Sequence, residues 1–547
     1  MRMRGRIAAT VTLVCLRLTA VAAAGDDLLP ADVSIETAVD HYRDAGMTEA
    51  GVEAAQIIDD DAWLRRIMLD LAGRVPTLRE LEEFRSSDTV DKRAAVVDQL
   101  VQSPDFAFHL RNELDLQLLA KIREDGEWRS YLLAATRENR AWDRIFREVM
   151  LPEREKPDEK GAGAFLRERV KEIDDLTNDT ASLFFGVNIS CAKCHDHPLV
   201  ADWLQDHYFG MTSFFKRTYR TKQGMLAERF EGDVKFTTVA GEEKPAAFMF
   251  LTGTAIEEPP REVSDEEKEK IQQAIQQAEK EDNADPPPLP EFSPRTELVR
   301  LAVEDAEQNF LARNMVNRTW ARLMGRGLVH PLDQMHSENP ASHPELLNWL
   351  ARDFASHGYD LRRLIRGIVL SETYARDTRW TGESEPPADE LFAVGIPRPL
   401  TPRQLALSLT ISTSNPEQLP GLEKPEDWPQ RRENLENQAN GMASLIEIPE
   451  DGFQVSVEEA LLFSNSQRIE NDYLRDGGDK LVGNLKAIED DRESIVTLFE
   501  AVLSRPPTEE EIAACTDYLA ARPDRRVAGI QQLTWALLTT PEFRFNH

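Results

Sequence analysis

Residues 175–195 read Asp175-Leu-Thr-Asn-Asp-Thr-Ala-Ser-Leu-Phe-Phe-Gly-Val-Asn-Ile-Ser-Cys191-Ala-Lys-Cys194-His195. Leu176, Leu183, Phe184 and Val187 recur at a spacing that places them on one face of an α-helix. The stretch therefore predicts a helix over 175–187 that leads directly into a Cys-x-x-Cys-His segment.

The same helical pattern recurs outward along the chain. Apolar residues at four-residue spacing predict a helix over 62–72 that stops at Gly73, and Thr77 with Glu80 forms a capping box for the next one. Further helices are expected over residues 91–100, 106–122, 130–150, 311–324, 342–356 and 360–371, and from Thr401 onward. We therefore expect a mainly α fold with two helical bodies, at 55–225 and 295–547.

The segment between these bodies differs in composition. Residues 226–257 are β-prone at 234–239 and 248–251, which predicts a small hairpin or two strands. Residues 258–294 combine a polar helix over 264–282 with a proline-rich stretch at 286–290. This composition is typical of an exposed linker or insertion.

Two distant stretches share the order of their landmarks. Leu71-Ala-Gly-Arg-Val-Pro-Thr77-x-x-Glu80 parallels Leu503-Ser-Arg-Pro-Pro-Thr508-x-x-Glu511. The first is followed by Ser103-Pro-Asp-Phe106 and the second by Thr540-Pro-Glu-Phe543. The parallel indicates either two related helical units or two capped helix pairs that merely look alike.

The chain is acidic, with a formal net charge of −32 over 547 residues. A field of this sign repels phosphate backbones and anionic headgroups, so neither nucleic acid nor a membrane surface is an expected partner. Residues 1–24 instead combine a basic start, an apolar run and Ala22-Ala23-Ala24, which predicts a signal peptide and a periplasmic or extracellular protein. The alternative is that residues 1–24 stay uncut and hold the protein in the membrane. No further membrane span is expected after cleavage.

Cleavage would leave three cysteines, Cys191, Cys194 and Cys515. Three are too few for a disulfide framework in a chain of this size. Cys515 lies on an apolar helix face and is expected to be a buried free thiol. The other two belong to one five-residue motif.

Cys191-Ala-Lys-Cys194-His195 has the spacing for covalent attachment of haem c. The two thiols would add to the haem vinyl groups, and His195 would be the proximal iron ligand. Asp196 and His197 are candidates for supporting contacts to that histidine, as is Asp202. Met211 or His207 could supply the sixth ligand.

Two other interpretations stay open at this point. Cys191, Cys194, His197 and His207 offer two thiolates and two imidazoles, a set that suits tetrahedral zinc. Alternatively, Cys191 and Cys194 form a disulfide in a scaffold without a cofactor.

A weaker histidine group follows later in the chain. His330, His336 and His343 lie near Asp333 and Glu338, but Pro331 and Pro340 place them on loops. Surface and capping roles are favoured over a metal site there. Catalytic residues, and whether the protein is an enzyme, are not predicted from the sequence.

Several motifs carry a family resemblance. Asn178-Asp-Thr-Ala, Phe184-x-Gly186, Cys191-Ala-Lys-Cys-His-Asp-His-Pro198, Trp203, Tyr208-x-Gly210 and Phe214-Phe215 resemble the planctomycete cytochrome-c-like domain of unknown function. Asn317-Arg-x-Trp320, Gly325-Arg-Gly-Leu-Val329, Asn339-Pro-x-Ser-His-Pro-Glu-Leu-Leu347 and Ser371-x-Thr-Tyr374 resemble the planctomycete-specific domain that usually follows it, as does the ending from Leu503. The similarity spans roughly residues 55–547.

The resemblance implies an exported haem c-binding or redox-associated protein whose biochemical role is not established in the family. A single Cys-x-x-Cys-His motif would need an external redox partner to pass electrons. The alternatives are a Cys/His metal-binding protein associated with extracellular carbohydrate processing and a disulfide-stabilised, non-catalytic scaffold. The oligomeric state is left open.

Overall fold

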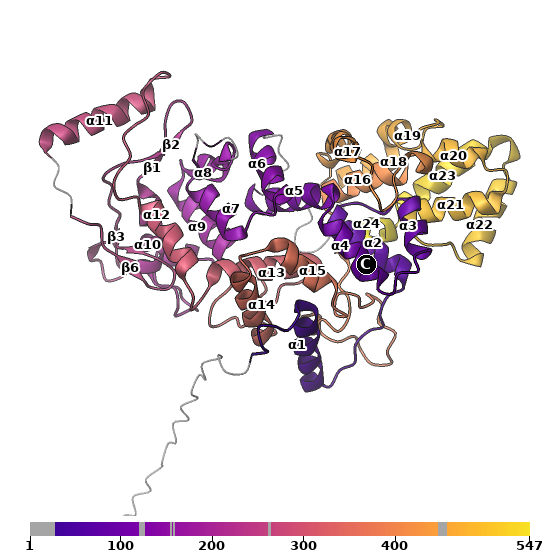
Figure 1. Ribbon diagram of the computed structural model, residues 1–547, viewed down its shortest axis with the longest axis horizontal. Helices are drawn as coiled ribbons and strands as arrows, with labels where there is room; N and C mark the ends of the chain where they lie inside the picture. Colours follow the sequence, from indigo (N-terminus) through magenta and orange to yellow (C-terminus); the bar gives the residue numbers. More distant parts are fainter. Residues whose placement is uncertain (1–27, 120–125, 154–155, 157–158, 261–263, 447–456) are drawn as a thin grey trace, which may run out of the picture.

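The computed structural model describes residues 28–119, 126–153, 156, 159–260, 264–446 and 457–547. The predicted signal peptide lies outside these residues. The described chain is mainly helical, as expected, and only short two-stranded sheets accompany the helices. The molecule is elongated, with α11 at one end and the C-terminal helices at the other (Figure 1).

Most helices that precede residue 370 build the larger part of the molecule. They are α1 (Ile35–Ala50), α2 (Asp60–Ile67), α3 (Leu78–Arg85), α4 (Lys92–Val101), α5 (Pro104–Leu119), α6 (Gly126–Arg137), α7 (Trp142–Met150), α8 (Ala164–Arg169), α9 (Ile173–Phe185), α10 (Gln205–Lys216), α11 (Asp265–Lys280), α12 (Pro294–Glu304), α13 (Phe310–Met324), α14 (Pro344–Ser356) and α15 (Leu361–Val369).

The remaining helices gather at the other end (Figure 1). They are α16 (Pro402–Ser412), α17 (Trp428–Ala443), α18 (Val457–Asn465), α19 (Gln467–Asp472), α20 (Leu481–Ala487), α21 (Asp491–Leu503), α22 (Glu509–Ala520), α23 (Arg526–Leu538) and α24 (Pro541–Arg544).

The buried apolar side chains form two main clusters. The larger one contains Trp142 and Phe184 together with Trp320 and Trp349, so it joins residues from both sides of the 258–294 segment. The smaller one runs from Leu400 to Phe543 and also takes in Leu69 and Val75. The composition change at 258–294 therefore marks a surface segment, while the buried core divides near residue 400.

The strands form four separate antiparallel pairs. These are β1 (Thr218–Arg220) with β2 (Leu226–Glu228), β3 (Lys235–Thr237) with β4 (Glu243–Pro245), β5 (Phe248–Met249) with β6 (Ala255–Ile256), and β7 (Arg398–Pro399) with β8 (Phe545–Asn546). The two β-prone stretches at 234–239 and 248–251 do contain strands, but each pairs within its own hairpin rather than with the other.

Local capping signals predicted several helix boundaries correctly. The capping box of Thr77 and Glu80 opens α3, and that of Thr401 and Gln404 opens α16. The helix expected over 62–72 is α2 continued by a π-helical turn, Met68–Ala72, and it ends at Gly73 with φ 70°. Only glycine adopts this left-handed conformation without a steric penalty.

Two boundary predictions were wrong. The single helix expected over 130–150 is interrupted between α6 and α7, where Asn139 has φ 51°. Asparagine is one of the few non-glycine residues that tolerate this left-handed region. The N-cap of α14 is His343 rather than Ser342.

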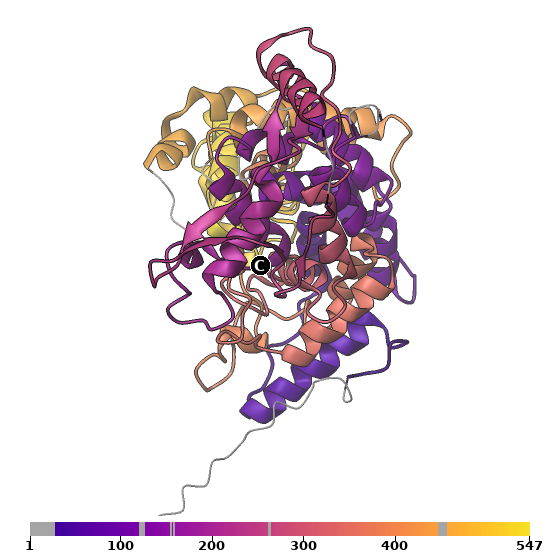
Figure 2. The ribbon, with the colours of Figure 1, turned by 90° about the vertical axis from the view of Figure 1, so that its left-hand side faces the viewer.

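The polar helix predicted over 264–282 is α11, and the Ser264 hydroxyl accepts the Glu267 amide hydrogen at its start. Its few buried residues include Ile275, which packs against Tyr219 and Ala227 of the β1–β2 hairpin. Figure 2, viewed from that end, shows α11 projecting from the body.

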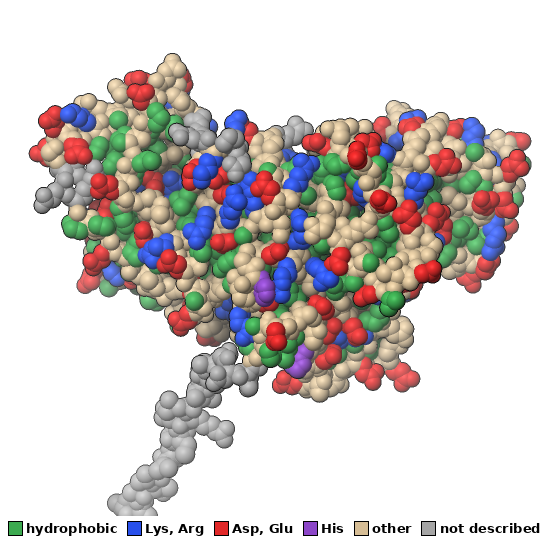
Figure 3. All heavy atoms as spheres, viewed as in Figure 1, with side chains coloured by type: hydrophobic (Ala, Val, Ile, Leu, Met, Phe, Trp, Pro, Cys, Tyr) green, Lys and Arg blue, Asp and Glu red, His purple; other side chains and the backbone are tan. Residues whose placement is uncertain are grey.

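Acidic side chains are spread over the face seen in Figure 3, with lysine and arginine side chains between them and gathered toward its middle. Within the described part of the chain, no helix is both long and apolar enough to cross a membrane.

Candidate functional site

The Cys-x-x-Cys-His segment lies between α9 and α10, in the left half of Figure 1. Helix α9 ends at Gly186, whose φ of 70° suits glycine and where a Cβ atom would lie 2.8 Å from Asn314 Oδ1. The chain then forms a short 3₁₀ turn, Ser190–Lys193. Ala192 is buried in this turn, whereas the flanking Cys191 and Cys194 are exposed free thiols.

A polar contact ties this turn to both neighbouring helices. Lys193 Nζ lies 2.6 Å from Asp174 Oδ2, and the Tyr208 hydroxyl donates to Asp174 Oδ1 at 2.6 Å. These two hydrogen bonds lower the pKa of Asp174. The carboxylate therefore joins α9, the 3₁₀ turn and α10 at one point.

His195 is exposed, and its ring orientation is set by the next residue. Its Nδ1 lies 2.8 Å from the backbone oxygen of Asp196. A carbonyl oxygen can only accept, so Nδ1 carries the hydrogen in the neutral ring. The Nε2 lone pair is then available to a metal ion.

His197 and His207 have the opposite arrangement. Nδ1 of His197 accepts the amide hydrogens of Leu199 at 3.3 Å and Val200 at 3.1 Å. Nδ1 of His207 accepts the Leu204 amide hydrogen at 3.1 Å, and burial lowers the pKa of this ring. In a neutral ring held this way Nε2 carries the hydrogen, so it has no lone pair for a metal ion until the loop bonds break.

Asp196 forms hydrogen bonds to its neighbours on both sides of the loop. The Asp196 carboxylate accepts the Gln205 amide hydrogen at 2.9 Å, at the first turn of α10. Asp196 thus contacts His195 through its backbone, as a supporting residue would, whereas His197 bonds its own loop. Met211, a candidate sixth ligand, is fully buried in the larger core.

A segment distant in sequence backs the motif loop. Met335 donates its amide hydrogen to the Gly186 oxygen at 3.0 Å, and Asn188 Nδ2 donates to Asp333 Oδ2 at 3.0 Å. Asp202 accepts two hydrogen bonds from Ser337. No sequence pattern predicted this contact, because its partners lie more than a hundred residues apart.

A cleft of about 580 Å³ opens beside the loop, and its lining includes Trp203, His207, Arg313 and His336. Trp203 Nε1, Arg313 Nε and His336 Nδ1 are buried and lack a hydrogen-bond partner among the described residues. Burial lowers the pKa of His336, so its ring is neutral at pH 7.

The other members of the weaker histidine group are separated from this cleft. His343 is buried, with its ring against Gly46, and His330 lines a different cleft, beside α13. In the part of the chain that the structure describes, no three His, Cys, Asp or Glu side chains are placed to hold a metal ion together. Cys515 is a free, half-buried thiol whose pKa is raised by burial.

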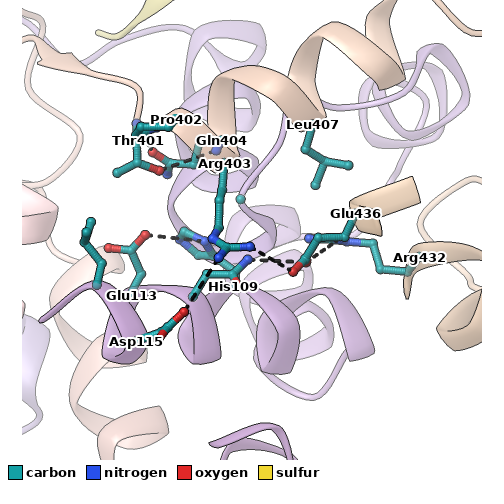
Figure 4. A pocket seen from close by; sticks show the side chains of 13 residues that line it. His109, Glu113, Asp115, Thr401, Pro402, Arg403, Gln404, Leu407, Arg432 and Glu436 are labelled. Carbon is teal, nitrogen blue, oxygen red and sulfur yellow. Dashed lines mark hydrogen bonds and ion pairs between the residues drawn. The ribbon is translucent and has the colours of Figure 1, made fainter. Parts of the chain in front are cut away.

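A second polar cluster, absent from the sequence predictions, lies where α5 meets α16 and α17 (Figure 4). Its centre is Glu436, which pairs with Arg111, Arg129 and Arg432, while Arg403 lies 3.9 Å away. Burial raises the pKa of Glu436, but the surrounding guanidinium groups lower it more, to about 2. The adjoining cavity of about 20 Å³ has room for one water molecule, so we interpret the cluster as structural.

Fold and site together define a mainly helical protein with an exposed Cys-x-x-Cys-His loop braced by a second domain. Residues 38–220 match the family model PSCyt2, described as a protein of unknown function (DUF1549), and residues 294–447 match PSD1, likewise of unknown function (DUF1553). The chain thus contains these two domains in this order. The search of curated proteins and the search of solved structures gave no match.

The motif loop and the segment that contacts it lie in different family matches. The Cys-x-x-Cys-His loop lies in the PSCyt2 region, whereas the segment 333–337 that backs it lies in the PSD1 region. The motif itself therefore belongs to the PSCyt2 region, and the PSD1 region supplies part of its support.

Proposed function

We propose that this protein is an exported haem c-binding protein with a redox role, in which Cys191 and Cys194 form the thioether bonds and His195 binds the iron. The observation that carries the proposal is the hydrogen bond of His195 Nδ1 to the Asp196 carbonyl oxygen, beside two exposed free thiols. Histidine ligands in metal sites characteristically donate their other ring nitrogen to a carbonyl or carboxylate oxygen.

The residues present fit the attachment chemistry. The thiols are accessible on a short turn anchored by Ala192, and Lys193 fixes that turn to Asp174. The Asp196 carbonyl oxygen holds His195 in the tautomer that a ligand needs. A haem bound here would supply one-electron redox chemistry.

Neither expected sixth ligand is free in this arrangement. Met211 is enclosed by the core, and His207 uses Nδ1 to accept a backbone hydrogen bond. We therefore propose that His195 would hold the iron and that neither Met211 nor His207 would bind it.

The zinc alternative has less support from the same geometry. His197 and His207 would each have to give up hydrogen bonds to the loop before Nε2 could bind a metal ion. Cys191 and Cys194 are free thiols in the structure rather than a disulfide, and the experiment below separates the haem interpretation from the zinc interpretation.

We also propose that the protein is exported and that it exchanges electrons with an external redox partner. The chain contains one Cys-x-x-Cys-His motif and would therefore bind one haem c. A protein with a single haem would pass its electron to another molecule. The basic and apolar residues of 1–24 support export, and the exposure of Cys191 and Cys194 would leave a haem edge accessible to a partner.

The test is expression in a host with a haem c maturation system, followed by haem staining after denaturing electrophoresis and a pyridine haemochrome spectrum. The wild type should retain one haem per chain through denaturation, and Cys194→Ser should show much weaker staining. His195→Ala should lose the wild-type iron coordination, whereas the matched controls His197→Ala and Cys515→Ser should keep it. A colourless wild-type protein would refute the proposal, and zinc at one ion per chain would then favour the metal alternative.

A further inference from the structure

The two similar sequence stretches fold into the same polar construction. Arg74 donates to both carboxylate oxygens of Glu80, each at 2.8 Å, and to Asp105 at 2.7 Å. We call Arg74, Glu80 and Asp105 the N-terminal anchor. Thr77 and Glu80 form the capping box of the helix that follows.

The second stretch repeats each contact. Arg505 donates to both carboxylate oxygens of Glu511, each at 2.9 Å, and to Glu542 Oε2 at 3.0 Å. Thr508 and Glu511 form the capping box. We call Arg505, Glu511 and Glu542 the C-terminal anchor. The residue directly before each arginine also has a left-handed backbone conformation, with φ 70° at Gly73 and φ 61° at Ser504. The parallel in sequence is therefore a structural repeat.

The two anchors differ in exposure. The Arg74, Glu80 and Asp105 side chains are each 0% exposed. The equivalent side chains are 31% exposed for Arg505 and 33% for Glu511, and Glu542 is 29% exposed. The same construction is thus covered in one unit and open in the other.

The chain itself covers the N-terminal anchor, with residues 420–432. The Thr77 hydroxyl donates to the Pro420 oxygen at 2.8 Å, and Lys424 pairs with Glu80. Trp428 Nε1 donates to Asp105 Oδ1 at 3.1 Å, and its ring centre lies 5.8 Å from the Arg74 guanidinium carbon. Arg432 Nε lies 3.1 Å from the same Asp105 oxygen.

This covering segment has a simple chemical pattern. Lys424, Trp428 and Arg432 follow one another at four-residue spacing, so an aromatic ring lies between two cations. The anchor has two carboxylates to one guanidinium, and each of the two cations contacts one of these carboxylates: Lys424 contacts Glu80 and Arg432 contacts Asp105. The indole supplies the apolar area and one N–H donor.

Beside the C-terminal anchor there is a cleft of about 840 Å³, lined by Arg505 and Glu542 of that anchor. Arg505, Thr508, Pro541 and Glu542 line one wall, and Ala62 lies in the wall formed by the start of α2. The lining contains four carboxylates, of Asp59, Asp61, Asp377 and Glu542, and three guanidinium groups, of Arg65, Arg379 and Arg505. Acid therefore exceeds base by one side chain in this cleft, which also has room for an indole ring.

We propose that the C-terminal anchor is a docking site for a segment of a partner protein that presents a basic, an aromatic and a basic residue at four-residue spacing, as residues 424–432 do. The partner is a different protein rather than a second copy of this chain, because the Trp428 of each copy is already fully buried on its own N-terminal anchor. The proposal does not depend on the haem assignment.

The test uses a fluorescein-labelled synthetic peptide of residues 420–436, titrated with the full chain and followed by fluorescence anisotropy. We expect saturable binding, and a peptide with the Trp428→Ala change should bind at least about tenfold more weakly, because a buried tryptophan is a typical interface hot spot.

Two protein variants locate the binding. Ala62→Phe fills the cleft without touching the anchor ion pairs and should abolish binding, while Leu289→Phe, at an exposed position that does not line this cleft, should leave it unchanged. Thermal unfolding checks that both variants fold. Absence of binding to the wild type, or equal binding to Ala62→Phe, would overturn the proposal.

Discussion

Asp202 accepts two hydrogen bonds from Ser337, one from the backbone nitrogen at 2.8 Å and one from the hydroxyl at 2.9 Å. Asp202 follows the Cys-x-x-Cys-His motif in the PSCyt2 region, and Ser337 belongs to the PSD1 region. The contact fastens the loop of one domain to the surface of the other, so the motif's conformation depends on both.

Asp202→Asn should therefore loosen the motif loop. Loss of the charge weakens both hydrogen bonds, and we expect a decrease of about 1 kcal/mol in the free energy of unfolding. Limited proteolysis should cut near residues 196–204 faster than in the wild type. Asp206→Asn, whose carboxylate pairs with Lys244 instead, is the control and should not speed this cleavage.

Thiol reactivity should separate the three cysteines in protein that lacks residues 1–24 and carries no haem. Cys191 and Cys194 are exposed, whereas Cys515 is half-buried and its pKa is raised, so less of its reactive thiolate is present. After reduction and desalting, a chromogenic disulfide reagent should modify two thiols quickly and one slowly. Two slow thiols and one fast one would contradict this description of the loop.

Met211→Leu should leave the spectrum of the haem-loaded protein unchanged. Met211 is fully buried in the core, and this near-isosteric change should cost less than about 1.5 kcal/mol of stability. A shift of the Soret maximum with intact folding would instead identify Met211 as an iron ligand.

Glu436→Gln should destabilise the protein strongly. The change leaves Arg111, Arg129 and Arg432 buried without their shared carboxylate, and breaking a buried ion pair costs about 3–5 kcal/mol. Chemical denaturation measures the loss. Glu433→Gln, one helical turn earlier and partly exposed, is the matched control and should have a small effect.

The lowered pKa of Glu436 also predicts how the free energy of unfolding changes in acid. Its pKa is lowered to about 2 in the folded protein, from an ordinary 4.5, so its stabilising contribution is fully present above 4.5. That contribution should be lost as the pH falls from about 4.5 toward 2. The stability difference between wild type and Glu436→Gln should shrink over this range, and a constant difference would contradict the assignment.

The sequence by itself determined the features that depend only on residues close together in the chain. The mainly helical fold follows from apolar spacing, and the capping box of Thr77 and Glu80 needs only residues within one helical turn. The spacing of Cys191, Cys194 and His195 likewise names the candidate chemistry without any tertiary information.

The tertiary structure alone decided which of these local features are accessible and what supports them. Thr77-x-x-Glu80 and Thr508-x-x-Glu511 form the same capping box, yet only the first is buried, because residues 420–432 pack over it. The Asp202–Ser337 contact and the Glu436 cluster likewise join residues that are far apart in the sequence. Such contacts depend on how whole helices pack around two cores, and a periodic pattern of side chains does not specify which helix meets which.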